Sequence, residues 1–249
     1  MHKENQMFSS NKIIGILGGG QLGKMTLEVS NKWGLKVYIL DPDENCPSRP
    51  FCSKFFQGDL MDFNTVYNFG KEVDLITIEI ENINVEALIE LNKENKIVYP
   101  QPEILKIIQD KSLQKEFYFE HNIPSTSFKK FNTKEELKDF ISNDERPYPF
   151  IWKSSKMGYD GYGVKLIEDK NSFEDIPDKH CIIEDKAEIE KELSVMVVSM
   201  PSGEIINYPV VEMEFNSESN QVEYIISPAR IRKEIKEKAE NLAIKVSKS

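Results

Sequence analysis

The stretch FIWKSSKMGYDGYGV, residues 150–164, carries a lysine on an apolar segment and then places three glycines within six residues. The apolar residues predict a strand that delivers Lys153 from a buried position, and Gly158, Gly161 and Gly163 predict a loop with accessible backbone amides. A lysine ammonium suits phosphate oxygens, and a glycine loop can lie over them without side-chain clashes. A simple hairpin turn would explain the glycines but not the strand-borne lysine. We therefore expect the phosphates of a nucleotide to bind here.

A second part of a nucleotide site is suggested further along the chain. The run IIEDKA, residues 182–187, predicts a strand that stops at acidic residues, and a new strand begins at Glu192. The first strand end could offer backbone groups to an adenine edge, and Glu192 could accept hydrogen bonds from ribose hydroxyls. Acidic residues at strand ends are common, so this pattern is weak evidence by itself.

The first part of the chain alternates strands with helices. The predicted strands are residues 12–18, 36–41, 75–81 and 96–100, and the predicted helices are residues 20–33, residues 62–70 and a segment from Val85. Strict alternation is typical of a parallel sheet with helices on both faces. We expect a Rossmann-like domain over residues 12–109, preceded by a disordered tail over residues 1–11.

The motif GGGQLG, residues 18–23, follows the first predicted strand and opens a helix. Its GxGxxG spacing allows a tight turn and lets an anionic ligand approach amides at a helix N-terminus. Asp41 lies eighteen residues beyond Gly23, where a dinucleotide enzyme would place its ribose-binding carboxylate. A nicotinamide or flavin site and a purely structural glycine turn both remain open.

Two acids, Glu79 and Glu81, lie at the carboxyl end of the third predicted strand. Because side chains alternate along a strand, the two should share one face, near the crevice where open α/β sheets bind ligands. They could accept hydrogen bonds from a substrate amine or hydroxyl. The alternative is a strand end whose acids simply reach water.

After Pro102 the pattern changes. A predicted helix over residues 102–122 is followed by predicted strands at residues 149–155, 164–169, 181–186, 192–200, 204–215 and 221–227, and by a final helix over residues 230–248. Strands that follow one another with little helix between them indicate an antiparallel α+β unit. We expect an α/β protein whose second domain covers residues 110–249.

Composition narrows the classes of function. With 42 acidic and 32 basic side chains the net charge is -10, which opposes non-specific binding to nucleic acid. The three cysteines form no CxxC pair and have no histidine at metal-ligand spacing, which favours a reducing cytoplasm. The polar start and the strand-length apolar runs argue against secretion and membrane insertion.

Together these motifs resemble the ATP-grasp superfamily, and within it the ligases that carboxylate aminoimidazole ribonucleotide in purine synthesis. The segments that carry the resemblance are GGGQLGKM (18–25), TIEIEN (77–82), QDKSLQK (109–115), KSSKMGYDGYG (153–163), ELSVMV (192–197), YPVVE (208–212) and SPARI (227–231). The GYDGxG segment with its upstream lysine is highly specific, whereas GxGxxG is not. The resemblance extends from about Lys12 to the C-terminus.

The resemblance implies roles for particular residues. The Rossmann-like domain would face a ribonucleotide substrate rather than a dinucleotide, through Gly20, Gln21, Leu22 and Glu79. The catalytic positions would be Lys153, Tyr159 and Asp160. The implied ATP-binding residues are Lys111, Lys153, Gly158, Tyr159, Asp160, Gly161, Tyr162, Gly163, Val164, Glu184, Asp185, Lys186, Ala187 and Glu192.

The implied reaction is the ATP-dependent carboxylation of 5-aminoimidazole ribonucleotide by bicarbonate through carboxyphosphate, with Mg²⁺ and in a homodimer. The family continues past the position of Ser249 into strands that carry its magnesium ligands, so we expect no metal ligand in this chain and weak or absent activity. Three alternatives remain. They are another purine ligase of the superfamily, such as a formate-dependent glycinamide ribonucleotide transformylase, a nicotinamide oxidoreductase, and a nucleotide-binding module without catalysis.

Overall fold

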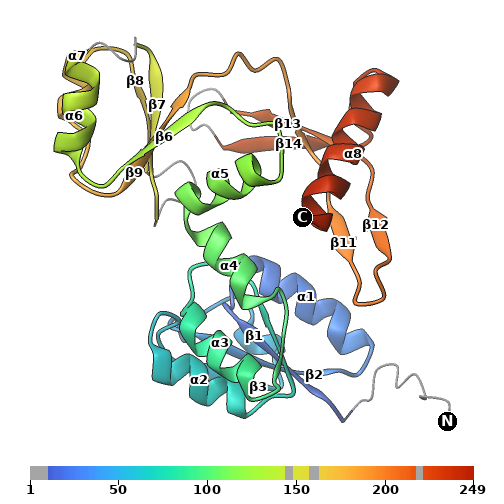
Figure 1. Cartoon of the computed structure of the whole chain (residues 1–249). Helices are drawn as coiled ribbons and strands as arrows, with labels where there is room; N and C mark the ends of the chain where they lie inside the picture. The colour runs from blue at the N-terminus through green and yellow to red at the C-terminus, as the bar shows by residue number, and fades with distance from the viewer. Residues whose placement is uncertain (1–10, 144–147, 157–162, 217–220) are drawn as a thin grey trace. The chain divides into compact units, whose positions relative to one another are not determined.

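The computed structural model describes residues 11–143, 148–156, 163–216 and 221–249 (Figure 1). The chain divides into two compact units, and the division falls between Gln109 and Asp110. Each unit has its own sheets and its own buried core, so each is described by itself.

The first unit is built on a parallel sheet. Its strands are β1 (Ile13–Leu17), β2 (Lys36–Asp41), β3 (Lys54–Gln57), β4 (Leu75–Ile78) and β5 (Ile97–Val98). They lie in the order β3-β2-β1-β4-β5, and every neighbouring pair is parallel. The parallel sheet is thus as predicted, although β3 was not, because KFFQ is too short to stand out from the surrounding loop.

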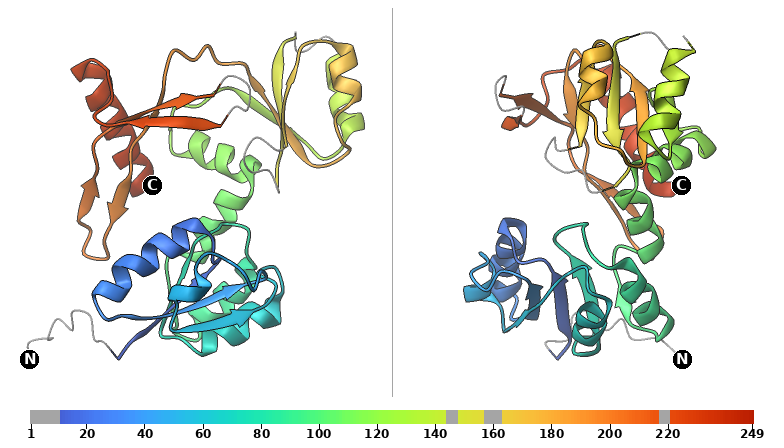
Figure 2. Two further views of the ribbon diagram at one scale, coloured as in Figure 1. Left: turned by 180° about the vertical axis from the view of Figure 1, so that it is seen from behind. Right: turned by 90° about the vertical axis from the view of Figure 1, so that its left-hand side faces the viewer.

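Helices cover both faces of this sheet (Figure 2, right). They are α1 (Gln21–Lys32), the short helix η1 (Arg49–Phe51), α2 (Phe63–Lys71), α3 (Val85–Lys93) and α4 (Pro102–Gln109). Alternate residues of β1 face opposite cores: Leu17 belongs to the core beneath α2 and α3, and Ile16 packs with Leu27 of α1. The period of two along a strand therefore divides the apolar residues between two helical layers.

Strand β4 ends three residues before the end of the predicted strand over residues 75–81, and this difference changes where two candidate site residues lie. Strand β4 ends at Ile78, so Glu79 and Glu81 lie in the loop after the strand and do not share a strand face. The backbone carbonyl of Glu81 accepts hydrogen bonds from the amide of Ile83, at 2.9 Å, and from the side chain of Gln109, at 2.6 Å. The amide of Glu79 still donates to the carbonyl of Leu17 on β1, at 2.7 Å, whereas the Glu81 carbonyl bonds to the loop and to α4 instead of to a neighbouring strand.

The predicted helix over residues 102–122 is two helices. Helix α4 ends at Gln109, and α5 (Lys111–Glu120) begins after Asp110, whose carboxylate accepts a hydrogen bond from the amide of Ser112 at 3.0 Å. An aspartate at an N-cap satisfies amides that have no partner within the helix. The cap starts a new helix at Asp110, which apolar periodicity alone does not reveal.

The second unit contains a four-stranded antiparallel sheet. Its strands are β6 (Phe128–Phe131), β7 (Phe150–Ser154), β8 (Val164–Ile167) and β9 (Cys181–Asp185), in the order β6-β9-β7-β8. Helices α6 (Lys134–Ser142) and α7 (Lys170–Glu174) lie on one side of the sheet, and α5 lies on the other (Figure 1). The antiparallel arrangement was predicted. Strand β6 and the two small helices were not.

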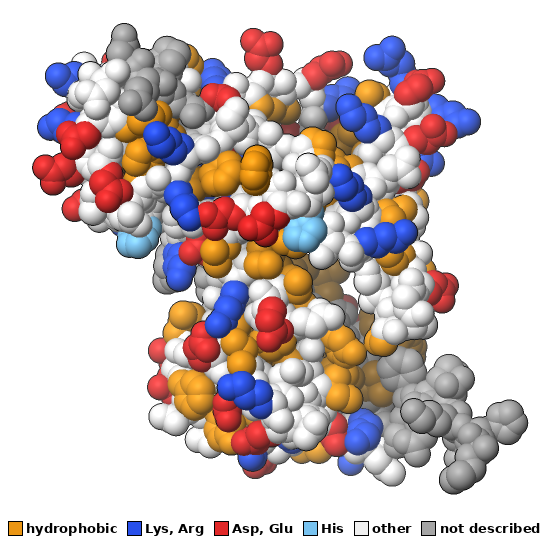
Figure 3. Space-filling view, viewed as in Figure 1, with side chains coloured by type: hydrophobic (Ala, Val, Ile, Leu, Met, Phe, Trp, Pro, Cys, Tyr) orange, Lys and Arg blue, Asp and Glu red, His pale blue; other side chains and the backbone are white. Residues whose placement is uncertain are grey.

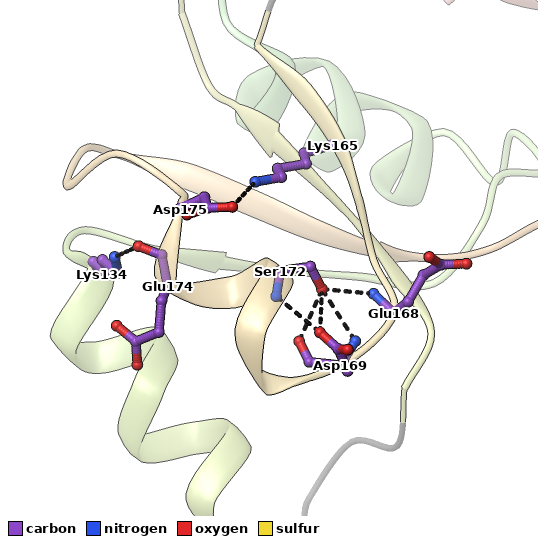
Figure 4. Close-up of polar contacts among 7 residues, drawn as sticks. All are labelled: Lys134, Lys165, Glu168, Asp169, Ser172, Glu174 and Asp175. Carbon is purple, nitrogen blue, oxygen red and sulfur yellow. Dashed lines mark hydrogen bonds and ion pairs between the residues drawn. The ribbon is translucent and has the colours of Figure 1, made fainter.

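Polar contacts fix α7 against its surroundings (Figure 4). Asp169 caps the helix by accepting from the amide of Ser172 at 2.8 Å, and the Ser172 hydroxyl accepts from the amide of Asp169 at 3.1 Å. This reciprocal pair is a capping box. The ammonium of Lys134, at the start of α6, donates to the carbonyl of Glu174 at 2.6 Å. The two helices are thereby linked over the core face of the sheet.

The remaining strands form two smaller sheets. The three-stranded sheet has the order β10-β13-β14, from β10 (Glu192–Ser194), β13 (Val211–Phe215) and β14 (Val222–Ile226), and the hairpin pairs β11 (Val197–Ser199) with β12 (Ile205–Asn207). Two predicted strands, residues 192–200 and 204–215, are therefore each divided between different sheets. Strand propensity does not specify a partner, because pairing depends on residues distant in sequence.

The last helix, α8 (Lys233–Lys248), packs on the hairpin of β11 and β12. No helix among residues that the structure describes is long and apolar enough to cross a membrane. On the face shown in Figure 3, basic and acidic side chains are interspersed.

Candidate active site

In the first unit, a loop of glycines joins β1 to α1. The amide of Gly18 donates to the carbonyl of Leu40 at 2.9 Å, and the amide of Gly19 donates to the carboxylate of Asp41 at 2.6 Å. Gly18 has a φ of +98°, a conformation that side chains with a Cβ rarely adopt. The other oxygen of Asp41 accepts from the amide of Asp43 at 2.8 Å. Both carboxylate oxygens of Asp41 therefore bind backbone amides and hold the loop in place. In a dinucleotide-binding enzyme the corresponding carboxylate would instead bind the ribose hydroxyls.

The carboxylate of Glu79 lies directly against this loop. A Cβ placed on Gly18 or on Gly20 would come within 2.6 Å of a Glu79 carboxylate oxygen. The absence of a side chain at Gly18 and Gly20 therefore leaves room for the Glu79 carboxylate beside the turn. Glu79 is half-buried, and its side chain makes no hydrogen bond or ion pair with any residue in the described ranges. Its carboxylate is available to a ligand at the N-terminus of α1.

Gln21 and Leu22, which open α1, are both exposed beside the loop. Gly20 forms the N-cap of the helix and supplies no side-chain hydrogen bond to it. The amides at the start of α1 thus have no side-chain cap, so this end of the helix presents donors that suit an anionic group. The sequence placed Gly20, Gln21, Leu22 and Glu79 at one site, and the structure gathers Gly20 and Glu79 in contact distance there.

In the second unit, Lys153 and Glu184 lie on adjacent strands. Strands β7 and β9 are antiparallel, with Lys153 opposite Ile182 and Glu184 opposite Ile151. The two side chains are therefore diagonal neighbours on one face of the sheet. The other face carries Trp152, which belongs to the apolar core. The alternation of the strand thus separates the charged face from the packed one.

Glu184 is the centre of a buried network of charges. It is 5% exposed, and its carboxylate contacts Lys153 Nζ at 3.2 Å and Lys115 Nζ at 3.2 Å. The Thr126 hydroxyl also donates to it at 2.8 Å. Burial opposes ionisation of this carboxyl, but the Thr126 hydroxyl and the two ammonium groups outweigh burial and lower its pKa from the ordinary value. Glu184 is therefore an anion shared by two cations.

The two lysines of this network differ in what remains available to a ligand. The Lys115 side chain is 10% exposed, and its ammonium also donates to Ser125 at 2.5 Å and to Thr126 at 2.9 Å. The Lys153 side chain is 28% exposed, and within the described residues its ammonium contacts only Glu184. Lys153 is therefore the more accessible of the two ammonium groups, and its contact with a phosphate stays a prediction from the sequence.

The other predicted nucleotide-binding residues lie on several elements of the second unit. Lys111 begins α5, and its amide donates to the carbonyl of Ser155 at 2.8 Å, which ties the helix start to the end of β7. Asp185 ends β9, and its carboxylate accepts from the Ser127 hydroxyl at 2.5 Å. Lys186 and Ala187 follow in an exposed extended segment, and Glu192 begins β10 with its side chain exposed.

The glycine-rich loop is described only at its end. Gly163 has a φ of +80°, its carbonyl accepts from the amide of Ser154 at 2.8 Å, and Val164 begins β8. The predicted residues Gly158, Tyr159, Asp160, Gly161 and Tyr162 lie outside the described residues.

Sequence reasoning missed two features of the second unit. The first is Lys115, together with Thr126, in the Glu184 network. The second is Glu212, which is 3% exposed and accepts hydrogen bonds from Lys191 at 2.6 Å and from Arg230 at 2.9 Å. Arg230 and then Lys191 lower the pKa of Glu212 to about 2. A signal existed for both, since QDKSLQK, YPVVE and SPARI were singled out as segments without roles for these side chains.

Comparison with known proteins agrees with this division of the chain. Residues 11–109 match the ribonucleotide synthetase preATP-grasp domain, and residues 116–249 match the ATP-grasp domain. The parallel sheet with its glycine loop and the antiparallel sheet that carries Lys153 and Glu184 belong to the two domains of one class of protein. The chain belongs to the ATP-grasp family.

Its similarity to particular members is spread over nearly the whole chain. It is 33% identical to the phosphoribosylaminoimidazole carboxylase of Candida albicans over 96% of this chain and 43% of the relative. The N5-carboxyaminoimidazole ribonucleotide synthetase of Thermotoga maritima superposes with a TM-score of 0.82 and 34% identity, covering 95% of this chain and 61% of that one.

A third similar structure contains ligands. The N5-carboxyaminoimidazole synthase of Aspergillus clavatus, in complex with ADP and 5-aminoimidazole ribonucleotide, has a TM-score of 0.84 and 28% identity, covering 96% of this chain and 63% of that one. The chain therefore spans less than two thirds of the length of each of these three relatives.

Proposed function

We propose that this chain binds ATP and 5-aminoimidazole ribonucleotide and takes part in the carboxylation of that ribonucleotide by bicarbonate in purine synthesis. The observation that carries the proposal is the Lys153–Glu184–Lys115 network, which presents one partly exposed ammonium at the surface of an antiparallel sheet. The names of the relatives support the choice of reaction, because they are a carboxylase and two carboxyaminoimidazole ribonucleotide synthases.

The proposed chemistry has two steps. A bicarbonate oxygen attacks the γ-phosphorus of ATP, the bond to the β-phosphate oxygen breaks, and carboxyphosphate and ADP form. The exocyclic amine of the ribonucleotide then attacks the carboxyl carbon and loses a proton, and inorganic phosphate leaves. Phosphoryl transfer depends on alignment and on neutralised charge at the phosphate oxygens, which is the role we assign to Lys153.

The other nucleotide contacts are part of the same proposal. Lys111 would contact phosphate, and the segment from Glu184 to Ala187 would bind the adenine with backbone groups. Glu192 would accept hydrogen bonds from the ribose hydroxyls, and its side chain is exposed at the start of β10, where a ligand can reach it. Gly163 and Val164 would contact the phosphates at the end of the glycine-rich segment. Tyr159 and Asp160, together with the rest of that loop, stay predictions from the sequence.

The ribonucleotide side of the proposal rests on the first unit. Gly20, Gln21 and Leu22 would contact the substrate at the start of α1, where the helix has no side-chain cap. Glu79 would accept a hydrogen bond from the substrate, since its carboxylate has no hydrogen-bond partner among the described residues. A carboxylate kept beside a glycine loop suits a substrate amine.

Magnesium belongs to the reaction of the family, because ATP-grasp ligases use ATP with Mg²⁺. Within the described residues no group of three or more histidine, cysteine, aspartate or glutamate side chains is placed to hold a metal ion. No step of the proposed chemistry is assigned through the ion.

Assembly and location are further parts of the proposal. A homodimer in a reducing cytoplasm, acting on small molecules and not on nucleic acid, is what we expect. The cysteines are compatible with a reducing compartment, since Cys46, Cys52 and Cys181 are all free thiols.

The test is the release of ADP by the 249-residue chain in the presence of ATP, bicarbonate and 5-aminoimidazole ribonucleotide. Because we expect the activity of this chain to be weak or absent, the test concerns the requirements of any ADP release: it should need both co-substrates and be accompanied by transfer of label from ¹⁴C-bicarbonate to the ribonucleotide. ADP release that instead requires formate and glycinamide ribonucleotide would assign the chain to the other purine ligase. ATP binding without turnover would leave a nucleotide-binding module, and binding of NADH in place of ATP would contradict the proposal.

A further inference from the structure

A buried carboxylate that serves two lysines raises a question of charge balance. Lys115 and Lys153 together carry two positive charges, and Glu184 carries one negative charge, so the network has one cation more than it has anions. The excess positive charge can be used to bind a phosphate, because Lys153 is partly exposed. Lys153 can bind a phosphate in this way only if Glu184 still has another cation after Lys153 has moved away from it.

The geometry shows which lysine can move. Lys115 lies on α5 with three partners: its ammonium donates hydrogen bonds to Ser125 and Thr126 and forms an ion pair with Glu184. The Lys153 ammonium approaches both oxygens of Glu184, at 3.2 and 3.3 Å, and makes no other hydrogen bond or ion pair with the described residues. Moving Lys153 breaks contacts with one group, whereas moving Lys115 would break contacts with three.

The energetic requirement follows from burial. Glu184 is 5% exposed, and removing one partner of a buried ion pair is strongly unfavourable because the remaining charge is neither solvated nor paired. With Lys115 and the Thr126 hydroxyl in place, Glu184 keeps a cation at 3.2 Å and a hydrogen bond at 2.8 Å after Lys153 turns away. Without Lys115, the same movement would leave a buried carboxylate with a single hydroxyl.

We propose that Lys115 is a positioning residue that keeps Glu184 neutralised, so that Lys153 can exchange the carboxylate for a nucleotide phosphate. Lys115 does not touch the nucleotide. It acts through Glu184 and sets the free energy required to release Lys153. The inference rests on the proposed binding of ATP at this site. It adds to that proposal a role for Lys115 and the exchange of Glu184 for a phosphate as the partner of Lys153.

The experiment measures how much the phosphates contribute to binding. Dissociation constants for adenosine and ATP are determined by titration calorimetry for the 249-residue chain and for Lys115→Met, Lys115→Arg and Lys115→Met/Glu184→Gln. The readout is the ratio of the adenosine constant to the ATP constant within each variant. This ratio removes any change at the adenine contacts and leaves the phosphate-dependent gain.

We expect Lys115→Met to reduce this ratio about tenfold, which corresponds to roughly 1.4 kcal/mol. Lys115→Arg, which keeps a cation, should stay within about threefold of the parent by the same scale. The double variant has no carboxylate anion to hold Lys153, so the ratio should recover to near the parent value. Recovery is the diagnostic result, because a merely structural lysine would give a double variant no better than Lys115→Met.

Folding is checked for every variant by circular dichroism and urea unfolding. If Lys115→Met does not fold, the ratio for the double variant and for Lys115→Arg still decides, since the inference requires both to resemble the parent. An unchanged ratio in Lys115→Met, or no recovery in the double variant, overturns the inference while the parent still binds ATP. If the parent gains no affinity from the phosphates, the proposed function and the inference both fail.

Discussion

The two units treat a carboxylate beside a ligand site in opposite ways. Glu184 in the second unit is buried and has a hydroxyl and two ammonium groups around it, whereas Glu79 in the first unit is half-buried with no polar partner among the described residues. The difference separates two uses of the same side chain. Glu184 organises other groups, and Glu79 is left available for a substrate.

The surroundings explain the difference. Glu184 is carried by a central strand of the antiparallel sheet and faced by α5, so its charge must be neutralised within the protein. Glu79 follows the end of β4 at the edge where parallel strands finish, against glycines that leave room for its oxygens. Strand ends of parallel sheets are where α/β proteins bind ligands, so a carboxylate there can keep its hydrogen-bonding capacity unused.

The largest effect is expected at the lysine that Glu184 holds. Lys153→Met should lower the rate of ADP release about 10²- to 10³-fold, because one preorganised positive charge at the phosphates is lost. A matched control is Lys130→Met on β6 of the same sheet, where the lysine forms an exposed ion pair with Glu116. The control should keep its activity, and an equal loss in both variants would contradict the assigned role.

Replacing each carboxylate by its amide tests the comparison directly. Glu184→Gln should lower the free energy of unfolding by about 3 kcal/mol, because two buried or half-buried ammonium groups lose their counter-ion. Glu79→Gln should change it by less than about 0.5 kcal/mol, as for a residue without internal partners. Urea unfolding measures both, and equal destabilisation would show that the two carboxylates do not differ in this way.

The same pair should separate in activity as well. Glu79→Gln should lower turnover that depends on the ribonucleotide about tenfold to a hundredfold, the usual range for a lost hydrogen bond to a charged group. Its affinity for ATP should not change, since Glu79 belongs to the ribonucleotide side. A fall in ATP affinity with normal ribonucleotide dependence would remove Glu79 from the substrate site.

A smaller effect is expected from crowding Glu79. Gly20 has an ordinary φ of -70°, so Gly20→Ala introduces no backbone strain and acts through the 2.6 Å approach of its new Cβ to Glu79. We expect KM for the ribonucleotide to rise about threefold to tenfold, or roughly 1 kcal/mol. The effect should be smaller in a Glu79→Ala background, and an undiminished effect there would show that Gly20 acts elsewhere.

The smallest effect concerns acid stability. The pKa of Glu212 is lowered from 4.5 to about 2 by Arg230 and Lys191, so its stabilising contribution is present above pH 4.5 and is lost as the pH falls towards 2. Glu212→Gln should therefore flatten the decline of unfolding free energy between pH 4.5 and about pH 2. Glu214→Gln, at an exposed partner of the same arginine, is the control and should keep the parent slope.

Several features could be predicted from residues near one another in the sequence. The alternation of apolar runs gave the parallel sheet of the first unit, and the lysine before the glycines gave the charged face of β7. Both depend on local periodicity, which the strand geometry imposes directly. The family resemblance assigned Gly20 and Glu79 to one site, and the structure brings these two residues within contact distance, while their role in substrate binding stays a prediction.

Other features depend on residues that meet only in the folded chain. Nothing local marks Lys115 as the second cation of Glu184, because α5 and β9 are far apart in sequence and become neighbours through packing. The division of residues 192–200 and 204–215 between two sheets was hidden for the same reason.

The sequence by itself determined that the chain has an alternating α/β half, a strand-rich half and a lysine followed by a glycine-rich loop, because these are written in local order and spacing. Only the tertiary structure decided that the Glu184 carboxylate has charged and hydrogen-bonding partners within the protein, whereas the Glu79 carboxylate has none among the described residues. Burial and ion pairing depend on the three-dimensional neighbours of a side chain, and Glu79 and Glu184 are the same residue type with opposite surroundings.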